Sequence, residues 1–469
     1  MASLDAKPRW RSACGKIVEA SRRAEQFLQP LLWMEVFPEQ LGADATESVA
    51  FTHPTAQSHP QAPLEGSATA VTQSVAAETR TQGEAQAEDF PDENSGGGNE
   101  AKIQNLEHKL LELKNKRSHE DHPNIAATLH ELGVVSCQAG DLKGAKQQLE
   151  ESLRMKRSLH GDKDHPDIAG TLHELGMVSV EAGDFKGAKQ QLEESLRMKR
   201  SLHGDKDHPD IAGTLHSLSM VSVEAGDLTS AKQQLEESLR VERSLHGDKD
   251  HPDIAGTLRQ LGVVSRWAGD LEGAKQQLEE SLRMERSLHG DEDHPDIAVT
   301  LRQLGVVSRR AGDLKEAKQQ LEESLPMKRS LHGDKDHPGI AATLHELGVV
   351  SCQAGDLEGA KQQLEESLRM KRSLHGDKDH PGIAATLHEL GLVSCWAGDP
   401  KGAKQQLEES LRMERSLHGD KDHPAIAVTL HELGVVSRRA GDLEEAKQQL
   451  EEDSSGGICM LPWHVLTLC

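Results

Sequence analysis

Apolar and polar residues recur along this chain with a fixed period of 43 residues. The dipeptide His-Pro marks the start of each copy, at His122, His165, His208, His251, His294, His337, His380 and His423. A period of roughly 20 to 50 residues is typical of repeat architectures, in which neighbouring units bury one another's apolar faces. The pattern therefore predicts one elongated array of eight copies over residues 122–452 rather than several globular domains.

Each copy contains two apolar stripes with helical spacing. In the second copy, the first stripe consists of Ile168, Leu172, Leu175, Val178 and Ala182. The second stripe consists of Phe185, Ala188, Leu192, Ser195, Leu196 and Leu202. Residues three or four apart share one helix face, so each copy is predicted to fold as two helices packed through these stripes. On the outer face of the second helix, Glu193 and Arg197 stand four apart and are predicted to pair.

Turn and cap residues separate the helices of a copy. Gly183 is free to adopt a positive φ, and Asp184 is suited to cap the helix that follows. Gly204 is predicted to end the second helix, and Pro209 to occupy the first turn of the next one. Each copy is therefore expected to be a helix-turn-helix unit with defined ends.

Two prolines depart from the repeat. Pro326 replaces the arginine found at Arg154 and Arg197, inside the second helix of the fifth copy. Proline there lacks a hydrogen-bond donor and clashes with the preceding turn, at a cost of about 3 kcal/mol, so a kink or break is predicted. Pro400 directly follows the capping residue Asp399 and is predicted to lie in a first helical turn, where proline is tolerated.

The segments that flank the array differ from it in composition. Residues 1–36 mix basic and apolar side chains and are predicted to form a short amphipathic segment, either a local helix, a docking segment or a targeting peptide. Residues 37–100 are rich in Pro, Ala, Gln, Ser, Thr and Glu and are predicted to be a disordered linker. Residues 101–121 align with the second helix of a copy and are predicted to cap the array as a half-repeat. Residues 453–469 form a short apolar tail, which is either a further cap or a truncated gene end.

Charge and cysteine usage narrow the function classes. The net charge of −24 argues against a nucleic-acid binder, which requires a basic surface. The sequence has no apolar run of 18 residues, so no membrane span is predicted. The six cysteines show neither Cys-x-x-Cys nor a disulfide framework, which favours a reducing, cytoplasmic location.

The sequence offers little catalytic chemistry. It contains no phosphate-binding loop, no nucleophile elbow and no dinucleotide fingerprint, so neither a catalytic residue nor a cofactor is predicted. The loop between copies is rich in potential metal ligands, for example His160, Asp162, Asp164, His165 and Asp167. Calcium-loop spacing is absent, and aspartates beside a helix N-terminus are favourable without a metal, so no metal site is predicted.

A family resemblance rests on the spacing of small and apolar residues. Leu129, Leu132-Gly133 and Ser136, followed by Ala145 and Leu149, match the tetratricopeptide repeat skeleton. The long second helix and the loop His-Gly-Asp-Lys-Asp-His-Pro resemble the repeats of kinesin light chains and of nephrocystin-3-like proteins. The resemblance implies an all-α, right-handed α-solenoid of helix-turn-helix repeats.

The resemblance also implies a function. Kinesin light chains are non-enzymatic cargo adaptors that bind peptide segments in a concave groove and assemble with kinesin heavy chain. They use a heptad coiled coil ahead of the repeats for that assembly, and no sustained heptads precede residue 101 here. The alternative function is a signalling or regulatory scaffold of the nephrocystin-3-like or sensor type, with no motor association. Neither nucleic acid nor membrane is an expected partner.

Differences among the copies indicate where a ligand is expected to bind. The resemblance places positions 2, 5, 9, 12 and 13 of each first helix on the concave groove, counting Gly133 as position 8. The predicted groove residues are Arg259, Arg266, Trp267, Arg302, Arg309, Arg310, His216, His345 and Trp396. Arginine is suited to bidentate recognition of carboxylates, so acidic or extended peptide segments are the predicted ligands. Neutral drift at exposed positions is the alternative explanation.

Overall fold

The computed structural model describes residues 96–115, 122–161, 163–204, 206–247, 249–290, 292–333, 335–376, 378–419, 423–443, 446 and 448–449. The predicted segment 1–36, the predicted linker before Gly96 and the tail 453–469 lie outside the described residues. Within the described ranges, all regular secondary structure is α-helical.

The helices follow the 43-residue period. They are α3 (Gly96–Asn115), α4 (His122–Gln138), α5 (Leu142–His160), α6 (Pro166–Glu181), α7 (Phe185–His203), α8 (Pro209–Glu224), α9 (Leu228–His246), α10 (Pro252–Trp267), α11 (Leu271–His289), α12 (Pro295–Ala311), α13 (Leu314–His332), α14 (Pro338–Gln353), α15 (Leu357–His375), α16 (Pro381–Ala397), α17 (Pro400–His418) and α18 (Pro424–Ala440).

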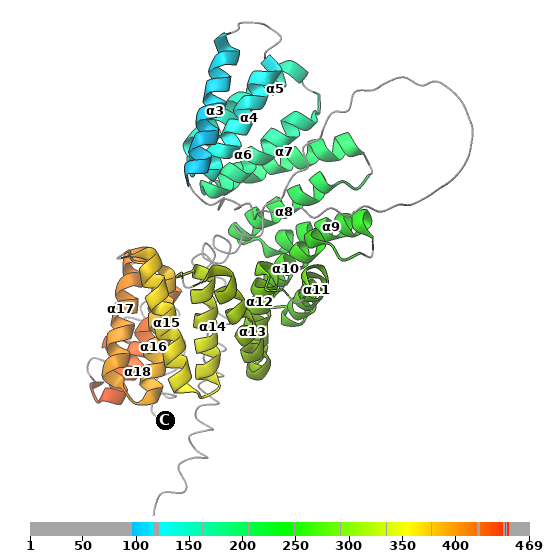
Figure 1. Cartoon of the computed structure of the whole chain (residues 1–469). Coiled ribbons are helices and arrows are strands. Elements are labelled where there is room, and N and C mark those ends of the chain that lie inside the picture. Colours follow the sequence, from blue (N-terminus) through cyan, green and yellow to red (C-terminus); the bar gives the residue numbers. More distant parts are fainter. Residues whose placement is uncertain are drawn as a thin grey trace, which may run out of the picture.

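Each helix packs on the one before and the one after it. The two helices of a copy form the closest pairs, such as α6 with α7, and the second helix then packs on the first helix of the next copy. Figure 1 shows these pairs stacked into a curved array that runs from α3 at one end to α18 at the other. The predicted all-α, right-handed α-solenoid is confirmed.

The predicted stripes form the core. In the second copy, Leu172 and Leu175 of α6 and Leu192 of α7 are at most 2% exposed. Gly176 allows the close approach of the two helices, because a Cβ at this position would lie 2.6 Å from Cγ of Leu192. Two members of the predicted stripes are wrong. Ala182 is exposed, since it lies at the C-cap of α6. Leu202 is 38% exposed, since it lies in the last turn of α7 beyond the packed interface.

The helix ends lie where the sequence predicts them. Asp184 caps α7 by accepting a hydrogen bond from the backbone N–H of Gly187 at 3.0 Å. Gly183 and Gly204 adopt φ of 74° and 61°, and Pro209 begins α8. These three predictions are confirmed, as is the first-turn position of Pro400 in α17. Arg197 differs from its prediction, because its guanidinium binds Asp164 at 3.0 and 3.2 Å.

The predicted break at Pro326 is wrong. Helix α13 runs without interruption from Leu314 to His332 with Pro326 inside it. The physical reason is the position of the proline on the outer face, where both Pro326 and Glu322 are exposed. The Glu322 carbonyl, which lacks its helical donor, can therefore bind water instead.

The N-terminal end begins earlier than predicted. Helix α3 starts at Gly96, inside the predicted linker, and packs on α4. Its position on the first face of the array is the one expected of a capping half-repeat.

Candidate ligand groove and its arginine clusters

The first helices of the copies line one side of the array. Neighbouring first helices, for example α4 with α6 and α6 with α8, contact one another directly, as expected on the inner side of a curved solenoid. A hollow of about 330 Å³ opens there, lined among others by His130, Gly170 and His173. These residues stand at positions 5 and 2 of their copies. We call this inner side the groove.

Glycines keep part of the groove open. Gly170, Gly213 and Gly256 occupy position 2 in copies two to four. A Cβ added at any of them would meet no heavy atom within 4 Å. A chain that lies along these copies therefore meets free space at position 2.

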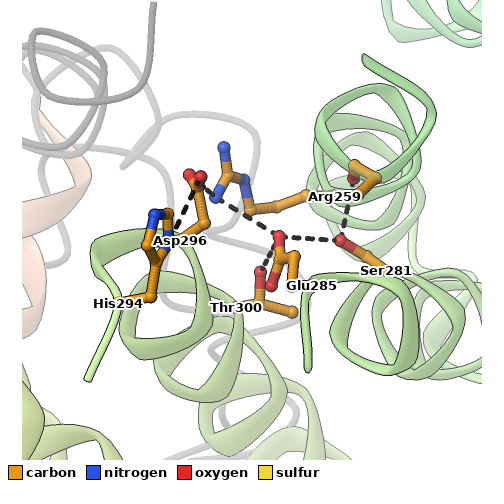
Figure 2. A network of polar contacts seen from close by, with 7 residues as sticks. Arg259, Ser281, Glu285, His294, Asp296 and Thr300 are labelled. Carbon is orange, nitrogen blue, oxygen red and sulfur yellow. Dashed lines mark hydrogen bonds and ion pairs between the residues drawn. The ribbon is translucent and has the colours of Figure 1, made fainter. Parts of the chain in front are cut away.

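Arg259, at position 5 of copy four, takes part in a network within the protein (Figure 2). Its Nη1 atom lies 2.8 Å from Asp296 Oδ1 and 3.6 Å from Glu285 Oε1. Asp296 belongs to the first turn of α12, where its backbone N–H donates to Nδ1 of His294 at 3.3 Å. The network thus joins α10, α11 and α12, and its one guanidinium faces two carboxylates.

Glu285 is the buried centre of this network (Figure 2). Its Oε1 atom accepts hydrogen bonds from Ser281 at 3.1 Å and from Thr300 at 3.0 Å. Burial raises the pKa of Glu285 to about 7, although the Arg259 charge and the two hydroxyl donors lower it. Arg259 is only 8% exposed, so it is not displayed to solvent in the way that the groove prediction assumes.

A second arginine group lies one copy further along. The group has four arginines and one glutamate, whose charges shift one another's pKa values. They are Arg266 of α10, Arg302, Arg309 and Arg310 of α12, and Glu346 of α14. Arg309 Nε lies 3.3 Å from Glu346 Oε2. We call these five side chains the arginine cluster. It is assembled from the first helices of copies four, five and six.

The arginines of the cluster are buried to different depths. Arg302 is 1% exposed and Arg266 is 3% exposed, whereas Arg309 and Arg310 are half-buried. Burial lowers the pKa of Arg266 well below its usual range, and the charges of Arg310, Arg302 and Arg309 lower it further. Nε and Nη2 of Arg266 are buried without a hydrogen-bond acceptor among the described residues.

The pKa of Glu346 is set by two opposing effects. Burial raises its pKa, but the combined charges of Arg309, His345, Arg302 and Arg310 outweigh that effect and hold the pKa at about 2. Glu346 therefore remains ionised across the physiological pH range. Its charge raises the pKa of Arg266, against the effects of burial and of the other arginines.

One buried position on the second helices is a lysine in some copies and a glutamate in others. It is occupied by Lys156, Lys199, Glu242, Glu285, Lys328, Lys371 and Glu414. The side chain usually bonds the threonine of the following copy, as in Lys199 to Thr214 at 2.7 Å and Thr257 to Glu242 at 2.9 Å. In copy four this position pairs an acid with Arg259, and in copy five it is occupied by the buried Lys328.

The remaining predicted groove residues divide into three groups. Trp267 is half-buried beside the core, and the Arg266 guanidinium lies 5.4 Å from its ring centroid. Trp396 packs on a separate core group around Leu390, so it does not join the arginine cluster. His216 and His345 are neutral at pH 7, because burial lowers their pKa values to about 4 and about 3.

The sequence reading did not identify Glu346 or Lys328. Glu346 follows the predicted groove residue His345 directly, but the same glutamate stands at Glu131, Glu174 and Glu389 and so gives no sequence signal. Lys328 belongs to the buried charged position of the second helices, which did carry a signal in its 43-residue recurrence.

The loops between copies contain stacked histidines with potential metal ligands nearby. In the clearest group, His160 and His165 stack with ring centroids 3.4 Å apart, and Asp167 lies beside them. A metal ion binds about 2 Å from a ring nitrogen and in the plane of the ring. It cannot lie in the planes of two stacked rings at once, and His165 Nδ1 already accepts the Asp167 N–H. The pair fits a helix-capping linker better than a metal site.

The described helices include none that is both long and apolar enough to span a membrane.

Comparisons with known proteins agree with this architecture. Models of the tetratricopeptide repeat match residues 167–244, 253–330 and 382–452, and a second such model matches residues 125–167 and 340–382. No curated protein sequence matches the chain.

Solved structures with a similar fold come from several organisms. The apo form of the quorum sensor NprR from B. thuringiensis is similar with a TM-score of 0.53 and 15% identity, over 77% of this chain and 99% of that chain. BtubC (BKLC) from P. vanneervenii is similar with a TM-score of 0.44 and 20% identity, over 50% of this chain and 92% of that one. A putative kinesin light chain with nearly identical TPR-like repeats from Podosopora anserina has a TM-score of 0.39 and 20% identity, over 45% and 99% of the two chains.

The likeness to NprR shows a shared fold and nothing about ligands. The family models, in contrast, cover most of the helix pairs from α4 to α18. The chain belongs to the tetratricopeptide repeat family.

Proposed function

We propose that the protein is a non-enzymatic adaptor that binds extended, acidic peptide segments of other proteins in its groove. The observation that carries the proposal is the arginine cluster. It gathers four guanidinium groups on the groove-lining helices of a chain whose net charge is −24. An acidic peptide would be repelled by most of the surface and attracted to this place.

Two further features support a peptide as the ligand. The hollow beside His130 and His173 and the open positions at Gly213 and Gly256 leave room for an extended chain along several copies. Trp267 offers a half-buried ring on which an apolar or aromatic side chain of the peptide can rest.

The three cysteines in the described part of the chain support a binding protein rather than a thiol enzyme. Cys137, Cys352 and Cys395 are free thiols. Burial raises the pKa of Cys352 to about 12, so the thiolate that nucleophilic catalysis requires does not form at neutral pH. Free thiols also support the cytoplasm as the location.

The test is a selection of peptides displayed on phage against the full chain, followed by measurement of Kd for the selected peptides. Acidic peptides are expected to be enriched, with dissociation constants in the micromolar range or tighter. Their affinity is expected to fall at least tenfold in the double variant Arg302→His with Arg309→Val. Histidine and valine occupy the same positions in copy two, at His173 and Val180, so the variant retains residues that the fold accepts.

Arg438→Val is the matched control. It removes an arginine from the same position in copy eight, away from the arginine cluster. Equal binding by the native chain and the double variant would exclude the groove of copies four to six as the binding site.

The alternative is a signalling or regulatory scaffold without a motor. The resemblance to kinesin light chains favours the cargo adaptor, and the similar fold of a quorum sensor keeps the sensor class as the second candidate. Affinity purification from cells distinguishes them. Kinesin heavy chain among the stoichiometric partners supports the adaptor, and its absence beside other stoichiometric partners supports the scaffold.

A further inference from the structure

Four successive junctions between copies have an aspartate in the first turn of the following helix. In chain order these are Asp167 of α6, Asp210 of α8, Asp253 of α10 and Asp296 of α12. Each aspartate lies close to the buried charged position of the preceding second helix. Burial shifts the pKa of the side chain at that position most strongly, and the charge of the aspartate shifts it as well. The junctions therefore repeat one arrangement of two charged side chains.

Three of these junctions contain a cation from the protein itself. In the first two, the buried position is a lysine, at Lys156 and Lys199. Burial lowers the pKa of each lysine, and the charge of the nearby aspartate raises it. In the fourth junction the buried position is Glu285, and Arg259 supplies the cation (Figure 2). Its Nη1 atom lies 2.8 Å from Asp296 Oδ1 and 3.6 Å from Glu285 Oε1.

The third junction places two acids together, Glu242 of α9 and Asp253 of α10. His216 of α8 stands where the next copy has Arg259. Burial and then the charge of Arg259 lower the pKa of His216 to about 4, so this histidine is neutral at pH 7. Among the described residues, neither Glu242 nor Asp253 forms an ion pair with a lysine or an arginine.

The loop histidines do not distinguish the third junction from the others. His246 and His251 lie 3.9 and 3.6 Å from Asp253. At the second junction the corresponding histidines lie 3.9 and 3.5 Å from Asp210, which has a lysine nearby as well. The same histidine pair thus accompanies the aspartate whether or not the protein supplies a lysine or arginine.

Glu242 has an unused acceptor at this junction. The residue is 6% exposed, and its Oε1 atom accepts hydrogen bonds from Ser238 at 3.1 Å and from Thr257 at 2.9 Å. Its Oε2 atom is buried without a donor among the described residues. A buried carboxylate oxygen that lacks a donor is costly, so a cation that enters the junction stabilises it.

The third junction can be reached from the groove. The side chain of Asp253 is 33% exposed, and its counterpart Asp210 lines the hollow of the groove. Gly213 stands three residues before His216, and a Cβ added there would meet no heavy atom within 4 Å. A side chain of a bound peptide therefore has free space beside the two acids.

We propose that an arginine side chain of the groove-bound peptide enters the third junction and pairs with Asp253 and Glu242, a proposal that rests on the proposed function. Arg259 makes the corresponding contact from within the protein at the next junction. A guanidinium is less strongly hydrated than an ammonium ion and donates to several acceptors, so it suits a partly buried pair of carboxylates. The ligand thus supplies the cation that the protein supplies at the other three junctions.

The position of the junction sets the spacing of charges in the peptide. Neighbouring copies are about 10 Å apart, and an extended chain spans roughly 3.3–3.6 Å per residue, so about three residues cover one copy. The arginine cluster takes its arginines from copies four and five, one and two copies beyond His216. The preferred peptide therefore has an arginine about three to six residues from its acidic residues.

The experiment compares capped, fluorescein-labelled peptides that contain a run of glutamates and, about five positions away, one test residue. The test residue is arginine, lysine or citrulline, which has the shape of arginine without its charge. Each peptide is made with the test residue before the glutamates and with the test residue after them. Burial raises the pKa of Glu242 to about 7, so affinities for the full chain are measured at pH 8 and physiological salt by fluorescence anisotropy. In one of the two orders, the arginine peptide is expected to bind about tenfold more tightly than the citrulline peptide and about threefold more tightly than the lysine peptide.

Three variants give the third junction a residue that another copy has at the same position. His216→Arg introduces the arginine of copy four, and Glu242→Lys introduces the lysine of copies one and two. Each places a cation of the protein in the junction and is expected to abolish the preference for arginine over citrulline. Asp253→Asn, which introduces the residue of Asn124, removes one acid and is expected to reduce the preference.

His388→Arg is the matched control. It makes the same substitution at the same position of copy seven, where Ala425 stands in place of the junction aspartate. The preference for arginine is expected to persist in this variant. Circular dichroism of all four variants checks that the helices are intact.

The outcomes separate this inference from the proposed function. Equal affinity for the arginine and citrulline peptides in both orders overturns the inference and leaves the acidic-peptide adaptor standing. A preference that persists in both His216→Arg and Glu242→Lys, or that is also lost in His388→Arg, overturns it too, because the arginine then binds elsewhere or responds to overall charge. Equal affinity for arginine and lysine overturns the assignment of a guanidinium. If the chain binds none of the peptides and the phage selection yields none either, both proposals fall.

Discussion

In most copies the two helices pack through a close contact between a glycine and a leucine. Gly133 meets Leu149, and the corresponding pair in copy four is Gly262 with Leu278, where a Cβ would lie 2.6 Å from Cγ of the leucine. The sequence predicts this contact, because a small residue at that offset is a feature of the repeat skeleton. Copy three accommodates both a Cβ and a hydroxyl group there, since Ser219 occupies the glycine position and donates to the backbone carbonyl of His216 at 2.6 Å. In the other copies the leucine must move to admit a Cβ.

Gly262→Ala tests the contact. The added methyl group must displace a fully buried leucine, so we expect the variant to lose about 1–3 kcal/mol of stability. Gly256→Ala, in the same helix, adds the same methyl group where nothing lies within 4 Å. That control is expected to gain about 0.5–1 kcal/mol from the better helix propensity of alanine. Urea unfolding followed by circular dichroism measures both, and similar changes in the two variants would contradict the packing argument.

Buried titratable side chains are the second feature at this scale. Glu242 is 6% exposed and accepts hydrogen bonds from Ser238 and Thr257, at 3.1 and 2.9 Å. Burial raises its pKa from the ordinary 4.5 to about 7, more than the two hydroxyl donors lower it. In the unfolded chain Glu242 releases its proton near its ordinary pKa, whereas in the folded chain it keeps the proton to about pH 7. Its contribution to stability is therefore present at low pH, declines as pH rises through this window and is lost above it.

Glu242→Gln removes this titration while its amide oxygen still accepts the two hydroxyl donors. We expect the variant to match the native chain near pH 4 and to exceed its stability at pH 8 by roughly 1–3 kcal/mol. Urea midpoints at pH 4, 6 and 8 measure the difference. Glu237→Gln, an exposed glutamate that binds Arg200 at 2.6 Å, serves as the control and should leave the pH profile between 4 and 8 as it is. A native profile that is flat between pH 4 and 8 would show that Glu242 is already ionised in the folded chain.

At the scale of the helix, the sequence predicts those helix ends that depend only on neighbouring residues in the chain. Three kinds of helix-end feature follow from one or two residues each, and all are confirmed. They are the cap at Asp184, the positive φ of Gly183 and Gly204, and proline in the first turn. Arg197 was not predictable in the same way, because its partner Asp164 comes from the loop before the preceding helix. Pro326 was mispredicted because the cost of a proline depends on whether water can reach the carbonyl that loses its donor.

In the candidate site, too, the identity of the residues can be read from the sequence but their partners cannot. The arginines of copies four and five are visible in the sequence as departures from the repeat. Their burial and their arrangement around Glu346 depend on the packing of α10, α12 and α14, which come from three copies. The sequence therefore predicts which groove positions differ between copies. It does not predict ion pairs within the protein, such as that of Arg259 with Asp296.

Pro326→Arg restores the residue of the other copies to α13. The substitution returns a backbone donor to the Glu322 carbonyl and removes the ring from the preceding turn. Because the carbonyl is exposed, the gain is expected to be smaller than the full cost of a buried helix proline, about 1–2 kcal/mol. Thermal unfolding measures it. Pro400→Ala, at the first turn of α17, is expected to change stability by less than about 0.5 kcal/mol, and an equal gain in both variants would argue against the positional explanation.

At the scale of the molecule, each copy interacts mainly with its two neighbours. Helix contacts run from each helix to the next, with weaker ones between first helices of adjacent copies. The stability of such an array is close to a sum of copies and of the interfaces between them. Ion pairs repeat along the outer surface with the same period, such as Arg243 with Glu280 at 2.8 Å and Arg372 with Glu409 at 2.8 Å. Exposed pairs of this kind contribute little individually, so the buried interfaces dominate the connection between copies.

The array should therefore tolerate removal of one whole period. Deleting residues 337–379 joins α13 to α16, and this new interface closely resembles the native interface of α13 with α14. The two first helices share Ile340/Ile383, Leu344/Leu387 and Leu347/Leu390 at the buried positions, and from the His-Pro onward they differ only at Val349/Leu392 and Gln353/Trp396. The neighbour of copy five is thus replaced by a nearly identical surface, and His388 and Glu389 take the places of His345 and Glu346.

We expect the deletion variant to fold with unchanged helicity per residue, to remain a single species in size-exclusion chromatography and to be shorter by roughly 10 Å in small-angle scattering, the spacing of packed helices. Deleting residues 357–378 instead removes α15 alone and sets two first helices side by side. The apolar face of α14 that packs on α15, which includes Gly348 against Leu364, then loses its partner. This control is expected to aggregate, because an exposed apolar helix face of that size associates with others. Equal folding of both deletion variants would show that the array is not built from complete 43-residue units, and loss of folding in both would show that copies five and six depend on contacts beyond their neighbours.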